Sequence, residues 1–235
     1  MSLAVAVVQG AVPRNETGGA GLLAIVRGVS AALSGEPIPD APAEVAHEAG
    51  LDAVCIGMGP TPMLYYAEAV LEGVDGGIEI TGSHNPANYN GFKMVLQGRP
   101  FFGSDIQLLG SMAAAGDWAD GSGTSEHFEI LDQYVARVAQ AAPTKAFRIG
   151  WDAGNGAAGP AIEKLVKMLP GEHHLLYVDV DGQFPNHHPD PTDENNLIDL
   201  RALVAEKQLD FGVAFDGDGD RIGAIDGQGR VIWGD

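Results

Sequence analysis

A polar loop between two short apolar segments holds the first reactive side chains of this chain. Residues 80–94 read ITGSHNPANYNGFKM, in which Ser83 offers a hydroxyl, His84 an imidazole and Lys93 an ammonium group. The Asn-Pro and Asn-Gly pairs favour tight turns, because Asn tolerates positive φ and Pro fixes φ. We expect the loop to present these groups between two strands. On local chemistry alone, a polar hairpin whose side chains only cap backbone groups is an equal alternative.

A second stretch, far downstream, has the pattern of a site for a small hard cation. Residues 211–226 read FGVAFDGDGDRIGAID, an apolar strand that ends in three carboxylates at alternate positions, Asp216, Asp218 and Asp220. Glycines between the carboxylates remove bulk and let them turn toward one cation. An EF-hand loop does not fit, because the sixth and twelfth positions hold Arg221 and Gly227 instead of Gly and Glu. A solvated acidic turn remains the alternative, since Asp-Gly pairs are ordinary turn residues.

Strands and helices are expected to alternate around these two stretches. The expected strands are 3–8, 51–57, 77–81, 92–96, 147–152, 175–180, 211–215, 222–225 and 230–233, and the expected helices are 21–33, 63–71, 104–112, 128–141, 160–169 and 197–207. Such alternation implies a parallel sheet with its ligand loops at the carboxyl ends of the strands. We therefore predict an α/β protein of two consecutive domains with mixed, mostly parallel sheets, 1–143 and 144–235, joined at the linker 143–145.

The two polar stretches together resemble a known family. TGSHNP followed by NGFK, and DGDGDR bounded by strands, are similar to the α-D-phosphohexomutase superfamily, most closely its bacterial phosphomannomutase/phosphoglucomutase branch. The resemblance implies that Ser83 carries a transferable phosphoryl group and that His84 touches substrate or phosphate. It gives Lys93 a role in proton transfer or phosphate positioning, and it turns Arg221 toward the substrate. It also implies Mg²⁺ held by four residues, Ser83, Asp216, Asp218 and Asp220.

The function implied by the resemblance is reversible phosphoryl transfer between C1 and C6 of a hexose phosphate. Mannose and glucose both fit, with glucose 1,6-bisphosphate or mannose 1,6-bisphosphate as activator. The motifs cover roughly 51–235, whereas residues 1–50 lack the family's YDIRG and GRDxRxSS segments and are expected to be atypical and poorly ordered. Family members have four domains, so a truncated member is expected. The alternative is a catalytically incomplete metal- or phosphate-binding remnant that associates, through the faces left exposed, with a partner supplying domains three and four.

Two other patterns compete for a functional interpretation. Residues 154–159 match GxGxxG between a strand and a helix, with Asp179 twenty residues further on, which is a fair dinucleotide-binding fingerprint. The alternative is a tight turn with close helix packing, and the family resemblance favours it because DAGNGAAG is similar to the second mutase domain. The pair His187-His188 suggests zinc, yet no cysteine or second histidine pair stands at ligand spacing. We therefore expect a rigid loop there.

Composition and charge narrow the class of protein further. The chain has 235 residues, with 13 basic and 32 acidic side chains and a formal charge of −19, which argues against nucleic acid or an anionic membrane as partner. The single cysteine, Cys55, lies in an apolar segment and is expected to be a buried thiol. No run of about 18 apolar residues and no basic start of a signal peptide are found, so a soluble, cytoplasmic protein is expected.

Overall fold

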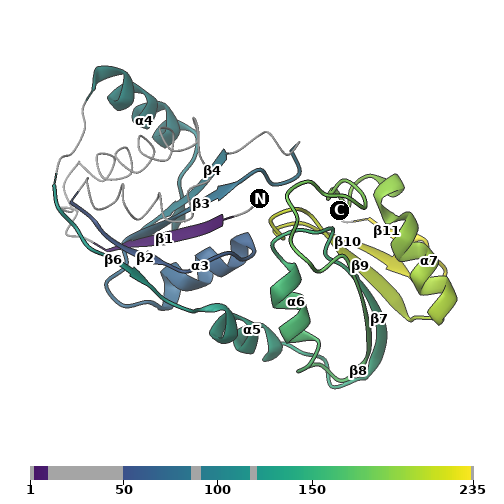
Figure 1. Ribbon diagram of the computed structural model, residues 1–235. Helices are drawn as coiled ribbons and strands as arrows, with labels where there is room; N and C mark the ends of the chain where they lie inside the picture. The colour runs from purple at the N-terminus through teal and green to yellow at the C-terminus, as the bar shows by residue number, and fades with distance from the viewer. Residues whose placement is uncertain (1–2, 10–49, 86–90, 117–120, 234–235) are drawn as a thin grey trace.

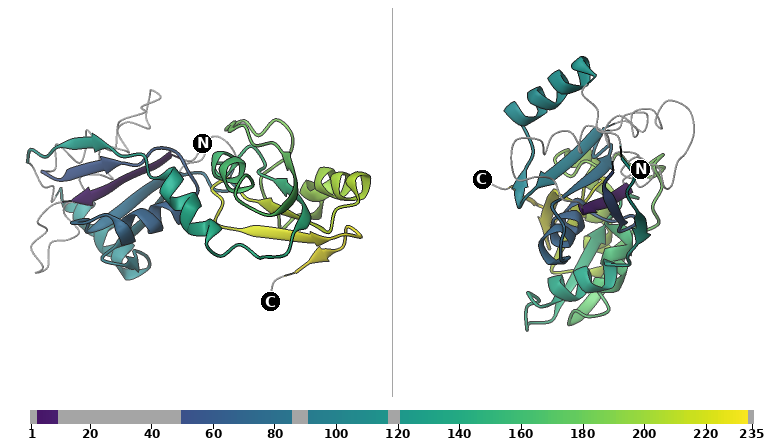
Figure 2. Two further views of the ribbon diagram at one scale, coloured as in Figure 1. Left: turned by 90° about the horizontal axis from the view of Figure 1, so that it is seen from below. Right: turned by 90° about the vertical axis from the view of Figure 1, so that its left-hand side faces the viewer.

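The computed structural model describes residues 3–9, 50–85, 91–116 and 121–233, of which 3–9 are described by their backbone. Two sheets with flanking helices follow one another along the molecule, as the left view of Figure 2 shows. The prediction of an α/β protein with two mixed sheets is confirmed. The helix expected at 21–33 and the turn residues 86–90 lie outside the described part of the chain.

The first sheet has the strand order β5-β4-β3-β1-β2-β6. Its strands are β1 (Leu3–Gln9), β2 (Asp52–Cys55), β3 (Gly76–Thr81), β4 (Gly91–Leu96), β5 (Arg99–Pro100) and β6 (Ser125–His127). Of the pairs between these described strands, β2–β6 is parallel and the others are antiparallel. The prediction of a mostly parallel sheet is therefore wrong here.

The position of β1 gives the physical reason for this error. The unit β2–α3–β3 makes the crossover that places two strands parallel to each other, but β1 lies between them and runs antiparallel to both (Figure 1). On the other side, β4 follows β3 directly in the chain and pairs with it as an antiparallel neighbour. Local alternation of strand and helix predicts the crossover but not which strand inserts into it.

Helix α3 (Thr61–Val70) covers one face of the first sheet, as Figure 1 shows, and helix α4 (Ser104–Ala115) lies at the β5 end of the sheet. Pro62 stands in the first turn of α3, where its missing N–H costs no hydrogen bond, so the helix begins two residues earlier than expected. Met63 and Leu64 are fully buried against the sheet. Gly77 permits this packing, because a Cβ at that position would lie 2.8 Å from Leu64 Cδ1.

The second sheet has the order β11-β10-β9-β7-β8, with two parallel and two antiparallel pairs. Its strands are β7 (Phe147–Asp152), β8 (Gly171–Leu176), β9 (Phe211–Phe215), β10 (Ile222–Asp226) and β11 (Val231–Ile232). The predicted hairpin at 222–233 is confirmed as the β10–β11 edge. The strand expected at 175–180 begins and ends four residues earlier, as β8. It includes the polar residues Glu172 and His173, which an edge strand tolerates.

Helices cover both faces of the second sheet. On one face α6 (Gly159–Leu165) packs Ile162 against Ile149 and Val213. On the other face the short 3₁₀ helix η1 (Glu194–Leu197) leads into α7 (Ile198–Lys207), which buries Leu200 completely. These two cores make the second domain a three-layer α/β/α unit.

Helix α5 (Leu131–Ala139) lies between the two sheets in Figure 1 and packs against both α3 and α6. The boundary at 143 stays a prediction, because α5 contacts elements on both sides of it. Cys55 is buried in β2, as expected. Among the described residues, no helix is long and apolar enough to cross a membrane.

Candidate active site

The serine loop and the aspartate loop meet although they are far apart in sequence. Ser83 Oγ donates to Asp216 Oδ2 at 3.1 Å and to Asp218 Oδ1 at 3.3 Å, across 133 and 135 residues respectively. The first loop leaves the end of β3 and the second follows β9, so each comes from the end of a strand in its own sheet. The geometry places the Ser83 hydroxyl against the carboxylates of Asp216 and Asp218, and both aspartates are fully buried.

Thr81 and Gly217 hold these loops together. Thr81 Oγ1 donates to Asp218 Oδ2 at 2.9 Å and accepts the Ser83 N–H at 2.8 Å. A Cβ at Gly217 would lie 2.2 Å from the Ser83 carbonyl oxygen, so only glycine allows this approach. Ser83 itself has a φ of 48°, a left-handed conformation that costs a non-glycine residue free energy and is common at functional sites. Sequence reasoning missed both Thr81 and Gly217 as site residues.

The three aspartates form a cluster with metal-site geometry. One oxygen from each of Asp216, Asp218 and Asp220 lies within 4.8 Å of the others. Burial raises the pKa of Asp216 above its ordinary value, and the charge of Asp218 adds to the rise, against the opposing effect of Arg221. Burial also acts on Asp218, but hydrogen bonds from Lys93 and Thr81 and the Lys93 charge outweigh it, so the pKa of Asp218 is lowered. Carboxylate oxygens gathered in this way suit Mg²⁺.

Lys93 supplies a cation to two of these carboxylates. Its Nζ lies 2.7 Å from Asp218 Oδ2 and 2.6 Å from Asp220 Oδ2, and it donates to Thr61 Oγ1 at 3.2 Å. Burial lowers the pKa of Lys93, but the bonds to the two carboxylates prevail, so its pKa is raised and the ammonium stays charged. The ammonium thus neutralises part of the negative charge of the cluster, between two of the carboxylates that could hold a divalent cation.

Arg221 and His84 complete the set of residues that the sequence predicted. The Arg221 guanidinium donates to Asp216 Oδ2 from Nε at 3.0 Å and from Nη2 at 2.9 Å, and it lies 3.8 Å from Asp190. His84 Nδ1 lies 3.2 Å from Ser83 Oγ. The structure thus brings all seven predicted residues into one cluster, while their chemical roles stay predictions.

The glycine-rich stretch 154–159 braces the aspartate loop. The Ala157 N–H donates to the Gly217 carbonyl at 2.9 Å, and a Cβ at Gly156 would lie 2.8 Å from that same oxygen. A Cβ at Gly159 would lie 1.9 Å from the Val178 carbonyl oxygen. These contacts support the interpretation of a tight turn with close packing.

The histidine pair lies at a different place in the second domain. His187 Nε2 lies 3.0 Å from the buried Asp152 Oδ2. Burial lowers the pKa of His187, but the Asp152 hydrogen bond and charge outweigh it and raise the pKa above its ordinary value. Within the described part of the chain, only the three aspartates form a group of three or more side chains that could hold a metal ion.

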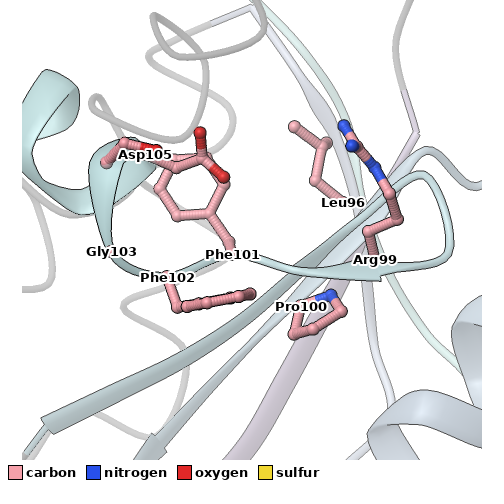
Figure 3. Close-up of a pocket in the computed structure, with 8 residues that line it drawn as sticks. Leu96, Arg99, Pro100, Phe101, Phe102, Gly103 and Asp105 are labelled. Carbon is pink, nitrogen blue, oxygen red and sulfur yellow. The ribbon is translucent and has the colours of Figure 1, made fainter.

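A cavity of about 490 Å³ lies away from these residues, between the turn after β4 and the start of α4. In the view of Figure 3, Arg99 and Asp105 stand at opposite ends of its lining, with Phe101 and Phe102 between them. A much smaller hollow is lined by Ser83 together with Gly217. Of the seven predicted residues only Ser83 lines this hollow, and none lines the larger cavity. We therefore place the candidate site at the cluster of these seven side chains around Ser83 and the aspartates.

Fold and site together define an α/β protein of two consecutive sheet domains whose serine and aspartate loops meet. The family model described as phosphoglucomutase/phosphomannomutase, alpha/beta/alpha domain I, matches residues 25–119, and the model for domain II of the same family matches residues 129–229. The chain belongs to the phosphoglucomutase/phosphomannomutase family. The match to domain I extends the resemblance to residues 25–50, which carry none of the motifs expected there.

Similar proteins are consistent with this assignment. The phosphomannomutase/phosphoglucomutase of Pseudomonas aeruginosa is 43% identical over 189 residues, which are 80% of this chain and 41% of that protein. The phosphoglucomutase of Neisseria meningitidis serogroup A is 39% identical over 218 residues, or 92% of this chain and 47% of that protein. A crystal structure of a phosphoglucomutase/phosphomannomutase family protein from Burkholderia thailandensis has a TM-score of 0.80 at 36% identity and covers 98% of this chain and 55% of that one. The chain thus spans less than half the length of these two curated relatives.

Proposed function

We propose that this chain performs the phosphoserine half of a hexose-phosphate mutase reaction. In the complete reaction, a phosphoryl group moves between the C1 and C6 oxygens of mannose or glucose phosphate by way of a bisphosphorylated sugar. The observation that carries the proposal is the approach of Ser83 Oγ to two buried carboxylates across 133 and 135 residues. The names of the similar proteins support the substrate class of hexose phosphates.

Ser83 is the group that exchanges phosphoryl with the sugar. Its Oγ forms a bond to phosphorus as the bond from phosphorus to a sugar oxygen breaks, and its proton passes to that leaving oxygen or to solvent. His84, at 3.2 Å from Ser83 Oγ, lies within reach of this proton. Ser83 stands two residues after the end of β3, in a left-handed backbone conformation with φ 48°.

Lys93 and Arg221 supply fixed positive charge near the transferred group. Phosphoryl transfer depends mainly on positioning and on neutralising negative charge. Because its pKa is raised, the Lys93 ammonium is suited to binding phosphate or donating a proton, and not to accepting one. Arg221 is held by Asp216 and has room to face a sugar phosphate, since about a third of its side chain is exposed.

Asp216, Asp218 and Asp220 would hold a magnesium ion, and phosphorylated Ser83 would add a fourth oxygen ligand. The fit rests on the oxygens of Asp216, Asp218 and Asp220, which lie within 4.8 Å of one another. When bound, Mg²⁺ offsets the charge that develops on the transferred phosphoryl group.

The test is the intact mass of the purified chain before and after incubation with glucose 1,6-bisphosphate and Mg²⁺. We expect the gain of one phosphoryl group in the wild type and in Ser111→Ala, which removes a hydroxyl from the exposed face of α4. Ser83→Ala should gain none. A wild-type chain that stays unmodified, or a Ser83→Ala chain that is modified equally, would contradict the proposal.

The second candidate is a metal- or phosphate-binding remnant that works with a partner. Three large apolar side chains exposed near the β10–β11 hairpin favour it: Ile222 at 63%, Ile232 at 57% and Trp233 at 61%. Exposed apolar side chains gathered at one edge are typical of an interaction surface. Sedimentation of the purified chain distinguishes the two candidates, because a well-behaved monomer that still phosphorylates Ser83 argues against the need for a partner.

A further inference from the structure

Glu79 is a buried acid with no role in the proposed function so far. It lies in β3, is fully buried, and faces Lys93 of β4 and Ala4 of β1 in the strand register. Among the described residues, neither of its carboxyl oxygens has a hydrogen-bond partner. A buried carboxyl without partners costs free energy, so its presence beside the candidate site calls for an explanation.

The surroundings of Glu79 keep it neutral in this state. Burial raises its pKa to about 8, and the charge of Asp218 contributes to the rise. Thr61 and Lys93 lower the pKa of Glu79 and so oppose this rise. Thr61 nevertheless makes no hydrogen bond of standard geometry to either Glu79 oxygen. The ionisable and polar groups around it come from α3, β4 and the aspartate loop: Thr61, Tyr65, Lys93, Asp218 and Asp220.

Lys93 forms salt bridges with two of the carboxylates that a divalent cation would need. Its Nζ lies 2.7 Å from Asp218 Oδ2 and 2.6 Å from Asp220 Oδ2. A divalent cation at these carboxylates would repel the ammonium, so Lys93 must move when the cation binds. Apart from the aspartates, Lys93 Nζ contacts the neutral Thr61 hydroxyl at 3.2 Å. A partly buried ammonium that leaves its carboxylates is stabilised by another negative partner.

Glu79 is placed to be that partner. Directly opposed residues of an antiparallel pair have Cβ atoms about 4.5–5.5 Å apart and project from the same face of the sheet. Glu79 and Lys93 are such a pair, so the ammonium can reach the Glu79 carboxyl without any change in the backbone.

We propose that Glu79 receives the Lys93 ammonium when a divalent cation binds the aspartates. Glu79 loses its proton to solvent in this step, and the new pair keeps Lys93 inside the site, where it can bind phosphate. Glu79 is thus a positioning residue that acts through Lys93. The inference rests on the proposed function, because it requires the metal site formed by Asp216, Asp218 and Asp220.

The test is calorimetric titration with Mg²⁺ of four proteins: wild type, Glu79→Gln, Lys93→Met and the double variant. Glu79→Gln keeps the volume of the side chain but cannot become charged, so we expect Mg²⁺ binding to weaken on the order of tenfold. Lys93→Met removes the competing ammonium and should strengthen binding. In that background Glu79→Gln should have almost no further effect. Glu163→Gln, on the exposed face of α6, is the matched control and should bind as the wild type does.

Two results would overturn the inference while leaving the metal site intact. One is equal Mg²⁺ affinity of Glu79→Gln and wild type, and the other is an equal loss in the presence and absence of Lys93. Absence of Mg²⁺ binding in the wild type would instead remove the metal site, and with it both proposals. A crystal structure of the Mg²⁺-bound wild type needs no variant: we expect Lys93 Nζ at hydrogen-bond distance from Glu79, and an ammonium still on Asp220 would contradict this.

Discussion

At the scale of single residues, the candidate site consists of oppositely charged side chains in direct contact. Three carboxylates share two cations, with Arg221 on Asp216 and Lys93 bridging Asp218 and Asp220. Asp216 and Asp218 are fully buried, so the stability of their charged forms depends on the paired cation. Removing Arg221 or Lys93 would leave a buried carboxylate unpaired. The residues that keep these groups at contact distance therefore matter as much as the charged groups themselves.

Gly217 offers a direct test of the contact between the two loops. We expect Gly217→Ala to push the Ser83 loop away, because the new Cβ would lie 2.2 Å from the Ser83 carbonyl oxygen. Phosphorylation of Ser83 should slow at least about tenfold, and stability should fall by about 1–3 kcal/mol, the usual cost of overpacking. The rate is followed by intact mass and the stability by urea unfolding.

Gly110→Ala is the control for this substitution. Gly110 lies inside α4 and has no atom within 4 Å of a Cβ placed there, so alanine should leave the protein unchanged or slightly more stable. Normal phosphorylation in Gly217→Ala would show that the two loops are not held by this contact.

Glu79 makes the stability of the metal-free protein depend on pH. Its pKa rises from the ordinary value of 4.5 in the unfolded chain to about 8 in the folded one. Between these values the folded state binds the extra proton, so the free energy of unfolding falls as pH rises, by at most about 1.4 kcal/mol per pH unit from this group. Below 4.5 and above 8 this contribution should be flat.

Urea unfolding at pH 5, 6, 7 and 8 without Mg²⁺ measures this slope. Glu79→Gln should unfold with a shallower dependence on pH, whereas Glu163→Gln should follow the wild type. Identical slopes for Glu79→Gln and wild type would mean that Glu79 is ionised throughout, and that its burial is offset in another way.

At the scale of elements, each sheet positions one loop, and the helices fix the sheets. Helix α3 both packs on the first sheet and touches the aspartate loop, since the Thr61 N–H donates to the Asp218 carbonyl at 2.8 Å. In the second domain the turn that leads into α6 contacts the aspartate loop, since the Ala157 N–H donates to the Gly217 carbonyl at 2.9 Å, and α7 packs on the sheet through a separate core. Each loop is therefore held by a sheet and by a helix packed on that sheet. This support explains how short glycine-rich turns keep a defined shape.

The packing of α7 gives a prediction about the second domain. Leu200 is fully buried, and Cβ atoms at Gly150 and Gly212 would lie 3.1 and 2.9 Å from its Cδ1, so the pocket is closely filled. Leu200→Ala should lower the free energy of unfolding by about 2–5 kcal/mol through the cavity it leaves. Ile198→Ala in the same helix is the control, because that side chain is 59% exposed and should cost about 0.5 kcal/mol or less. Equal losses of unfolding free energy in Leu200→Ala and Ile198→Ala, measured by urea unfolding, would show that Leu200 is not part of the core of the second domain.

At the scale of the whole molecule, the site joins the two domains. Ser83 and Thr61 from the first domain contact Asp216 and Asp218 of the second, and α5 packs on helices of both. A ligand bound there contacts both domains at once. With a formal charge of −19, the protein also gains from any cation that reduces the repulsion among its carboxylates.

We therefore expect Mg²⁺ to stabilise the folded chain as a unit. A ligand that binds only the folded state adds about 2.7 kcal/mol at one hundred times its dissociation constant. Thermal unfolding should shift upward with Mg²⁺ in the wild type and in Asp132→Asn, whose side chain is exposed on α5. Asp218→Asn should show no shift. A shift of the same size in Asp218→Asn would place the bound ion outside the aspartate loop.

Several features of this protein follow from short stretches of its amino-acid sequence. Ser83 and the three aspartates could be selected because a polar loop after a strand and carboxylates at alternate positions are patterns of neighbouring residues. Lys93 could be selected because it follows that loop at the start of the next strand, β4. The same holds for α4, α7 and the β10–β11 hairpin, whose periodicity and turn residues lie within one short stretch. The resemblance of both motifs to one family also predicted that the two loops act together.

Features that depend on residues far apart in the chain could not be predicted from local patterns. The insertion of β1 between β2 and β3 made the first sheet mainly antiparallel among its described strands, and no local pattern specifies which strand fills a crossover. The roles of Thr81 and Gly217 arise from contacts with partners more than a hundred residues away. Glu79 could have been noticed as an acid on the same strand face as Thr81, but its full burial opposite Lys93 is set by packing, because burial depends on everything that covers a residue.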